Sequence, residues 1–244
     1  MIIIQQNINK NNNCIKELMD TLLTKDPNII FFIEFCYANH ENEILKRLEN
    51  GYQIFLPWGF EDKDKKNSNI NAACMLAVKK EYTFEQKQRA SVCQKYRYIE
   101  GSIIKRDSKE RIECFFAYVQ QLFIERKYNY SNNDIDRYLR LAEKKANMLF
   151  EIYRFSEENK EKEFFIGGDL NTDIEENNSQ MISIFKTLYD NIVDTYKYET
   201  WSNKHLDYAL ISKVLNKEYT CRTTPIKTNS DHLALCTEIT PPKA

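Results

Sequence analysis

The sequence predicts an α/β protein in which mixed β-sheets are covered on the outside by helices. Short apolar runs typical of strands alternate with longer segments whose apolar residues recur every three or four positions. Two of the runs, near the middle of the chain, follow each other closely enough to form a hairpin. Because 244 residues with 42% hydrophobic content can bury one large core, we expect a single domain spanning residues 1–244.

In the N-terminal third, strands and helices are predicted to alternate. Ile2–Gln6 is a short apolar strand, and the segment from about residue 12 to Leu23 places its apolar residues on one helical face. Ile29–Ile33 is a continuous apolar run that ends at Glu34, the pattern of a strand buried on both faces. The remaining elements of this part are a helix at His40–Glu49 and strands at Tyr52–Leu56 and Ala72–Val78.

The central and C-terminal parts begin with the predicted hairpin. Its strands are Tyr96–Ile104 and Ile112–Val119, which flank a polar turn. The longest helical pattern covers about residues 133–155 and leads to a strand at Phe164–Ile166. The last expected elements are a helix near Ser179–Tyr189 and strands at Leu206–Ile211 and Leu233–Ile239.

Overall charge does not indicate a partner, because 35 Lys and Arg balance 36 Asp and Glu. Locally, the segment Lys79–Arg111 has ten basic and five acidic residues, with tyrosines at 82, 96 and 98. Cations attract phosphates and aromatic rings stack on bases, so this segment is a candidate phosphate-binding surface. A hairpin with a solvated outer face explains it equally well.

The seven cysteines are odd in number, widely spaced and without a Cys-x-x-Cys pair, which argues against a zinc site and a disulfide framework. Reduced thiols indicate a reducing compartment. The apolar start, Met1–Ile4, is too short for a signal peptide, and no segment approaches the roughly 20 apolar residues that span a bilayer. We therefore expect a cytoplasmic chain without a membrane segment.

The most informative motif is Phe-Phe-Ile-Gly-Gly-Asp-Leu-Asn-Thr at 164–172. An apolar strand runs into two glycines and then presents Asp169 and Asn171 on the same side of an extended turn. Two of only five glycines stand together here, where a backbone must bend tightly or approach a ligand closely. A carboxylate and a carboxamide in this position can grip a water or a phosphate oxygen. The motif alone fits a hairpin turn equally well.

Polar residues also stand at the ends of the other predicted strands and would converge at one sheet edge. They are Asn7, Glu34, Tyr118, Asp207 and the triplet Ser230-Asp231-His232. Each has a structural explanation as well. Glu34 also fits a solvated strand end, and Asp207 also fits a strand cap or an ion-pair partner of Lys204. Tyr118 also fits a core aromatic, and Asn7 and Asn9 belong to an Asn-rich stretch.

Taken together and in order, these motifs resemble the endonuclease/exonuclease/phosphatase superfamily, which includes deoxyribonuclease-I-like enzymes and abasic-site endonucleases. The resemblance covers nearly the whole chain. It rests on Gln-Asn-Ile-Asn at 6–9, the apolar run to Glu34, Ala-Tyr-Val at 117–119, Gly-Gly-Asp-Leu-Asn at 167–171, Leu-Asp-Tyr-Ala-Leu-Ile-Ser at 206–212 and Ser-Asp-His at 230–232. It implies a four-layer α/β sandwich of two mixed sheets with helices outside, and a divalent-metal site at one end.

The resemblance also implies a role for each residue. Glu34 would be the main Mg²⁺ ligand with Asn7 beside it, and Mn²⁺ would be a possible substitute ion. Asp231 would support the metal site or brace the loop. Asp169 would deprotonate the attacking water, Asn171 would hold that water or a phosphate oxygen, and Tyr118 would donate a hydrogen bond to the phosphate or leaving oxygen. His232 would contact the phosphate and be kept cationic by Asp207, with Asn9 and Ser230 near the substrate.

Two positions depart from the superfamily pattern. Val-Gln-Gln-Leu follows Tyr118, where abasic-site endonucleases carry Pro-Asn and deoxyribonuclease-I-like members carry a nearby His, which weakens the Tyr118 assignment. Asn9 stands where abasic-site enzymes often carry Asp, which favours one Mg²⁺ ion over two.

The resemblance leaves the substrate open among three classes. The motif style and the basic, Tyr-bearing segment favour a monomeric Mg²⁺-dependent DNA endonuclease or exonuclease. Balanced charge favours a phosphatase or phosphodiesterase acting on a phosphoinositide or small phosphate. An inactive binding scaffold is the third class, and retention of every acidic position argues against it.

Overall fold

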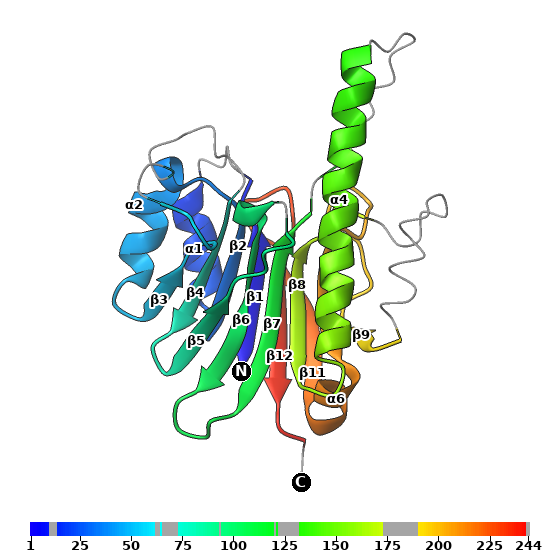
Figure 1. Ribbon diagram of the computed structural model, residues 1–244. Helices are drawn as coiled ribbons and strands as arrows, with labels where there is room; N and C mark the ends of the chain where they lie inside the picture. Colours follow the sequence, from blue (N-terminus) through cyan, green and yellow to red (C-terminus); the bar gives the residue numbers. More distant parts are fainter. Residues whose placement is uncertain are drawn as a thin grey trace.

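The computed structural model describes residues 1–9, 14–61, 64, 73–92, 94–119, 121, 132–172 and 190–242. Two six-stranded mixed sheets lie face to face, and helices cover their outer faces (Figure 1). This is the four-layer α/β sandwich that the resemblance implies.

The first sheet has the strand order β11-β12-β1-β2-β4-β3. Its strands are β1 Ile2–Asn7, β2 Ile29–Phe35, β3 Tyr52–Phe55, β4 Ala73–Lys79, β11 Thr220–Ile226 and β12 Ala234–Thr240. Only β1 and β2 pair in parallel. Helices α1 (Ile15–Leu23) and α2 (Tyr37–Leu48) cover its outer face.

The second sheet has the order β5-β6-β7-β8-β10-β9. Its strands are β5 Tyr82–Lys87, β6 Tyr98–Lys105, β7 Arg111–Tyr118, β8 Phe164–Asp169, β9 Ile192–Asp194 and β10 Asp207–Ser212. Here β7 and β8 are the parallel pair. The long helix α4 (Asn132–Glu158) packs on its outer face, and its N-terminal part extends beyond the sheets (Figure 1). The short elements η1 (Lys95–Arg97) and α6 (Lys213–Glu218) complete the described chain.

Strand β2 shows how an apolar run serves two cores. Its odd-numbered residues Ile29, Phe31 and Ile33 point into the core between the sheets. Ile30 and Phe32 point the other way, into the core beneath α1 and α2. A strand covered on both faces needs apolar residues at every position, which is why the run is continuous.

The predicted strands and the central hairpin are confirmed to within a few residues. Helix α2 begins at Tyr37 rather than at His40. Strands β5, β9 and β11 and helix α6 were not predicted. All three strands are sheet edges, where one side faces solvent and the apolar alternation is weak. The helix predicted near Ser179–Tyr189 lies outside the described residues.

Two further findings concern the cysteines and the helices. The described cysteines, at 14, 36, 74, 114, 221 and 236, are all thiols rather than disulfides. Among the described residues, no helix is both long enough and apolar enough to cross a bilayer.

Candidate active site

Several strands bring polar side chains to one end of the sandwich. In the second sheet, Tyr118 at the end of β7 pairs in register with Asp169 at the end of β8. Asp169 pairs in turn with Asp207 at the start of the antiparallel strand β10. Asn7 ends β1 in the facing sheet, beside β2 and Glu34. The predicted convergence of strand ends is therefore confirmed.

Glu34 is directed into this site by an irregularity in β2. The pairing of β2 with β4 shifts register between Phe32 and Phe35, and Glu34 has a left-handed φ of 58°. Such a bulge re-aims a side chain relative to the strand alternation. The half-buried Glu34 carboxylate accepts a hydrogen bond of 2.9 Å from the Tyr118 hydroxyl, so a residue of each sheet contributes to this contact.

Asn7 links two carboxylates that would otherwise repel each other. Its amide nitrogen donates to Asp169 Oδ2 at 3.1 Å and to Glu34 Oε1 at 3.4 Å. Its amide oxygen accepts from the backbone N–H of Asn9, which has a positive φ of 52°. Asn7 is 1% exposed, so these bonds hold the side chain in a fixed orientation.

The two glycines of β8 are required by close packing. Gly168 has a φ of 139°, and a Cβ there would lie 1.8 Å from the carbonyl oxygen of Ala117. A Cβ on Gly167 would lie 2.2 Å from the side-chain oxygen of Gln5 in the facing sheet. The hairpin-turn interpretation of this motif is wrong, because β8 pairs with β7 and β10 and not with the next strand, β9.

Beyond β8, the chain turns back on its own carboxylate. Asn171 has a left-handed φ of 47°, and its backbone N–H donates to Asp169 Oδ1 at 2.9 Å. Its side-chain amide donates to the Val119 carbonyl at 3.0 Å, beside the end of β7. The buried ammonium of Lys145 on α4 donates to the Asn171 carbonyl. Three hydrogen bonds therefore hold the turn in place: two donated by the backbone and side chain of Asn171, and one donated by Lys145.

His232 and Asp207 form a buried ion pair. His232 Nδ1 lies 2.8 Å from Asp207 Oδ2. Burial alone would lower the pKa of His232, but the charge of Asp207 and its hydrogen bond raise the pKa to about 9. The imidazole is therefore cationic at neutral pH. Asp207 is held at the start of β10 because Thr200 Oγ1 accepts hydrogen bonds from the backbone N–H groups of Leu206 and Asp207.

Asp169 has an environment suited to a proton acceptor. It is 1% exposed, and burial together with the nearby Asp207 charge raises its pKa above the ordinary range. The cationic His232 and the hydrogen bonds from Asn171 and Asn7 oppose that rise. The carboxylate is thus more basic than an exposed aspartate and still hydrogen-bonded.

The loop before β12 is tied to β1 and carries an aromatic contact. Ser230 Oγ donates to the Asn7 carbonyl at 2.6 Å. Trp201 stacks on the His232 ring, with centroids 5.9 Å apart and planes inclined by 27°. The Trp201 indole N–H donates to Asp231 Oδ2 at 3.2 Å. Asp231 is exposed and braces this loop. Trp201 is a site residue that sequence reasoning did not identify.

No model of a known protein family matches the chain, and no curated protein does. Solved structures do match. An AP endonuclease from Archaeoglobus fulgidus is 15% identical, with a TM-score of 0.70 over 98% of this chain and 99% of that chain. The human Nocturnin catalytic domain with bound sulfate is 16% identical, with a TM-score of 0.66 over 98% and 94%. TDP2 from D. rerio, complexed with single-strand DNA product, is 14% identical, with a TM-score of 0.65 over 97% of both chains.

The chain therefore shares the fold of these solved structures, which is the fold that the resemblance implies. Every residue to which the resemblance gave a role lies at the same end of the sandwich, in the hydrogen-bonded arrangement described above.

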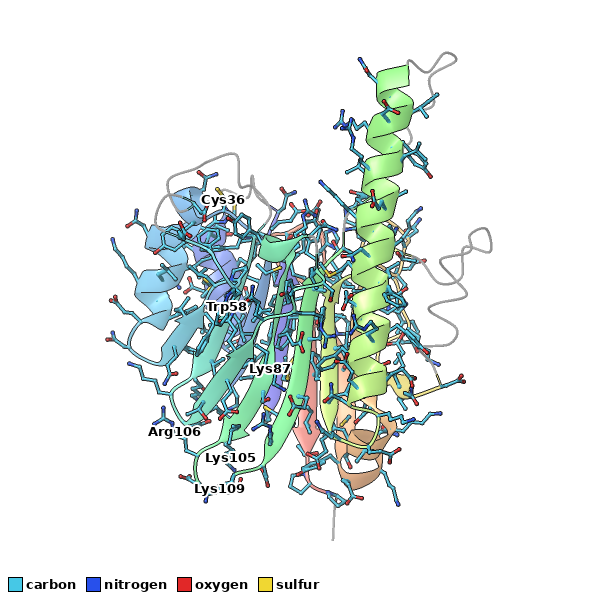
Figure 2. All side chains as sticks on the ribbon, viewed as in Figure 1. Cys36, Trp58, Lys87, Lys105, Arg106 and Lys109 are labelled. Atoms are coloured by element: carbon cyan, nitrogen blue, oxygen red, sulfur yellow. The ribbon has the colours of Figure 1, made fainter. Side chains whose placement is uncertain are left out.

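The basic segment Lys79–Arg111 is not a continuous phosphate-binding surface. Four of its cations, Lys79, Lys87, Arg89 and Arg111, pair with carboxylates. Tyr82 and Tyr98 are buried and cannot stack on bases. Lys105, Arg106 and Lys109 lie at the end of the sandwich opposite to Cys36, which follows β2 (Figure 2). The hairpin interpretation is therefore the better one for this segment, with Arg97 as the exception.

Arg97 is a site residue that sequence reasoning did not identify. It precedes β6, whose pairing with β7 sets Tyr98 opposite Ala117 and so places Arg97 next to Tyr118. Its guanidinium carbon lies 4.4 Å from the centre of the Tyr118 ring. The only sequence signal was its position within the basic segment.

Two groups at this end of the sandwich offer oxygen or nitrogen atoms to a metal. Asp169, Asp207 and His232 have ligand atoms within 4.8 Å of one another. However, His232 Nδ1 is engaged by Asp207, and a metal bound to that nitrogen would have to displace this hydrogen bond. Glu34 supplies a carboxylate at a half-buried strand end, with Asn7 in contact, and hard oxygen ligands suit Mg²⁺. The Glu34 side of the site fits a divalent cation better.

Proposed function

We propose that residues 1–244 form one catalytic domain that hydrolyses phosphodiesters in DNA with the help of a divalent metal ion. The observation that carries the proposal is the hydrogen-bonded connection from Tyr118 through Glu34 and Asn7 to Asp169. On its other side, Asp169 faces the His232–Asp207 ion pair. A proton acceptor, a cationic imidazole and a metal-type carboxylate thus surround one position where a phosphate can bind.

Asp169 is placed to accept a proton from the attacking water. Its raised pKa makes it a stronger base than an ordinary aspartate. Oδ1 accepts from Asn171 and Oδ2 accepts from Asn7, which fix the plane of the carboxylate. A base held rigidly in this way needs little reorganisation when the water is deprotonated.

His232 is placed to stabilise negative charge on a phosphoryl oxygen. Asp207 occupies Nδ1, so Nε2–H is the donor that a substrate can use. Because the pKa is about 9, the ring keeps its proton during the reaction at neutral pH. Preorganised donors of this kind are worth several kcal/mol when charge develops in a transition state.

Tyr118 is a hydrogen-bond donor on the opposite side of Asp169. Burial and the Glu34 charge raise the pKa of its hydroxyl, so it keeps its proton at any physiological pH. The hydroxyl donates to Glu34 at 2.9 Å in this structure, and a substrate oxygen near Glu34 would be within its reach.

The metal would be held by Glu34 with Asn7 beside it, leaving its other positions to water and to substrate phosphate. When bound, a divalent cation supplies Lewis-acid stabilisation of charge on phosphate oxygens. Oxygen-only ligands suit Mg²⁺, Mn²⁺ and Ca²⁺, and of these ions we propose Mg²⁺.

DNA is the proposed substrate because an AP endonuclease and a TDP2 complexed with single-strand DNA product have the same fold. A small phosphorylated compound is the second candidate. The observation that favours it is the pairing of basic side chains such as Lys79, Arg89 and Arg111 with carboxylates, which leaves fewer cations for a long polyanion.

Cleavage of supercoiled plasmid and of a duplex with one abasic site tests the proposal. The assay compares Mg²⁺ with EDTA and the unmodified protein with Asp169→Ala. Metal-dependent cuts that are absent in Asp169→Ala support a DNA nuclease, and the relative rates separate general nicking from abasic-site cleavage. No cleavage of either substrate, with turnover of a phosphoinositide or small phosphate, would establish the second candidate. No turnover of any substrate would favour a binding scaffold.

Salt dependence gives an independent comparison of the two candidates. DNA affinity should fall steeply with salt because counterions compete for each contacted phosphate. Turnover of a small phosphate should change little over the same range.

A further inference from the structure

Three half-buried aromatic residues form a row at the end of the sandwich that carries the candidate active site. They are Tyr37 at the start of α2, Phe60 in the segment after β3, and Tyr96 in η1, and we call them the aromatic row. The ring centroids of Tyr37 and Phe60 lie 6.3 Å apart, and those of Phe60 and Tyr96 lie 5.4 Å apart. Three segments that are distant in the sequence therefore bring their rings together.

Both ends of the aromatic row are adjacent to the candidate active site. Tyr37 follows Glu34 by three residues, in the segment that leaves β2. Tyr96 immediately precedes Arg97, whose guanidinium carbon lies 4.4 Å from the centre of the Tyr118 ring. The Tyr118 hydroxyl donates to Glu34 at 2.9 Å. A substrate whose phosphate lies at Glu34 would therefore have the aromatic row beside it, on the Tyr118 side of the site.

Hydrogen bonds hold Tyr96 in place. Its hydroxyl donates to Asp64 Oδ2 at 3.0 Å, and the same oxygen accepts from the backbone N–H of Glu61 at 2.9 Å. The side chain of Gln94, just before η1, donates to the Lys144 carbonyl on α4 at 2.8 Å. The η1 segment is thus fixed both to the residues that follow β3 and to α4. A ring held in this way binds a flat ligand at a lower entropic cost than a mobile ring does.

A tight turn separates the side chain of Phe60 from that of Trp58. The Phe60 backbone N–H donates to the Pro57 carbonyl at 3.0 Å, and Gly59 has a left-handed φ of 74°. These are features of a type II turn, in which glycine suits the third position. Phe60 is half-buried in the aromatic row, whereas Trp58 is 48% exposed and lies farther from the active-site end than Cys36 (Figure 2). The turn therefore directs one aromatic side chain to the row and one to solvent.

We propose that the aromatic row is a nucleobase-binding subsite, on which an unpaired base of the substrate strand stacks. This inference rests on the proposed DNA phosphodiesterase function and deepens it, because it names the kind of DNA that fits. Stacking on an aromatic side chain strengthens binding by about tenfold per base and depends little on which base is present. A base inside a duplex is already paired and stacked, so single-stranded or frayed DNA is the form that can place a base here.

Binding of two short fluorescein-labelled strands in EDTA tests the subsite without depending on turnover. One strand carries bases throughout, and the other has the same backbone with abasic residues at its centre. We expect the unmodified protein to bind the strand with bases about tenfold more tightly. Tyr96→Leu and Phe60→Leu should lose most of this preference, because they remove a stacking ring and leave the phosphate contacts in place.

Two further variants serve as matched controls. Tyr96→Phe keeps the ring and loses only the hydrogen bond to Asp64, so it should retain the preference for the strand with bases. Trp58→Leu removes an exposed aromatic side chain that lies outside the aromatic row, and it should retain the preference as well. An equal loss of preference in Trp58→Leu and Tyr96→Leu would overturn the assignment of the subsite to the aromatic row.

A purely structural role would give a different result. If the aromatic row only packs the segment after β3 against η1, Tyr96→Leu should lower the thermal stability and leave the preference for bases unchanged. That result would overturn the proposal. Equal weakening of binding to both strands would overturn it too, because a stacking residue acts through the bases.

Failure of the subsite and failure of the DNA proposal can be told apart by adding the Mg²⁺-dependent plasmid assay. If the unmodified protein cleaves plasmid but binds both strands equally, the DNA proposal stands and the aromatic row is not a base-binding subsite. If the unmodified protein neither cleaves plasmid nor binds either strand, both proposals are overturned.

Discussion

The side-chain amide of Asn7 donates a 3.1 Å hydrogen bond to Asp169, so β1 of one sheet orients the proposed base at the end of β8 in the other sheet. The same nitrogen reaches Glu34 at 3.4 Å. One amide therefore holds two carboxylates that lie on different sheets. Without that amide, or a cation in its place, their mutual repulsion would open this end of the sandwich.

Asn7→Asp places a third carboxylate between Glu34 and Asp169. We expect it to lower the free energy of unfolding by about 2 kcal/mol in EDTA, because a buried unpaired charge is costly. Mg²⁺ should restore more stability to this variant than to the unmodified protein, since a cation would neutralise the cluster. Urea unfolding with and without Mg²⁺ measures both effects. Asn7→Ala, which adds no charge, should show a smaller Mg²⁺ response than Asn7→Asp, and equal Mg²⁺ responses in all three proteins would contradict the account.

The His232–Asp207 pair makes stability depend on pH in a defined direction. The pKa of His232 is about 9 in the folded protein and ordinarily 6.5. A raised pKa stabilises the fold fully below 6.5, and this contribution is lost as the pH rises through 9. The shift corresponds to about 3 kcal/mol. Asp207→Asn should therefore be markedly less stable than the unmodified protein at low pH, with a difference that shrinks as the pH rises through 9. A difference independent of pH would exclude this pair as its source.

Gly168 should not tolerate a side chain. Gly168→Ala would combine a positive φ of 139° with a clash against the Ala117 carbonyl, and we expect a loss of at least about 3 kcal/mol in unfolding free energy. Gly51→Ala is the matched control, because nothing lies within 4 Å of its Cβ position. Thermal unfolding of the two variants measures the contrast, and similar melting temperatures would show that β8 can shift.

Trp201 should contribute to activity through His232. Trp201→Ala removes both the stack on His232 and the hydrogen bond to Asp231, and we expect kcat to fall about tenfold. Trp201→Phe keeps an aromatic ring over His232 and should lose less than about threefold. Steady-state kinetics on the preferred substrate compares them. If both variants lose activity equally, the indole N–H matters and the stack does not.

Most of the fold could be predicted from apolar patterns, because buried strands such as β2 need apolar residues on both faces. Edge strands could not. Strand β11 carries Arg222 and Pro225, and its alternation is hidden by polar residues on the solvent side. The bulge that aims Glu34 into the site also has no sequence signal, since it arises from the pairing of β2 with β4.

The residues of the site also fall into two groups, those that the sequence pattern predicts and those that it does not. Asn7, Asp169 and His232 stand at the ends of recognisable strands or beside them, so their convergence followed from the order of the elements. Arg97 and Trp201 stand in irregular segments. Arg97 reaches Tyr118 because of the register of β6 on β7, and Trp201 reaches His232 from a separate loop. Register and loop path are tertiary properties, and a single sequence does not specify them.

The most direct test of the proposed chemistry is the Mg²⁺-dependent rate of plasmid nicking by the unmodified protein and by Asp169→Asn. Asparagine has the shape of aspartate but cannot accept the proton, so the fold and the metal site should persist. We predict a loss of about 1,000-fold in the rate, with thermal stability retained. Asp169→Asn protein that nicks plasmid at the unmodified rate would contradict the assignment of Asp169 as the base and, with it, the mechanism proposed for this site.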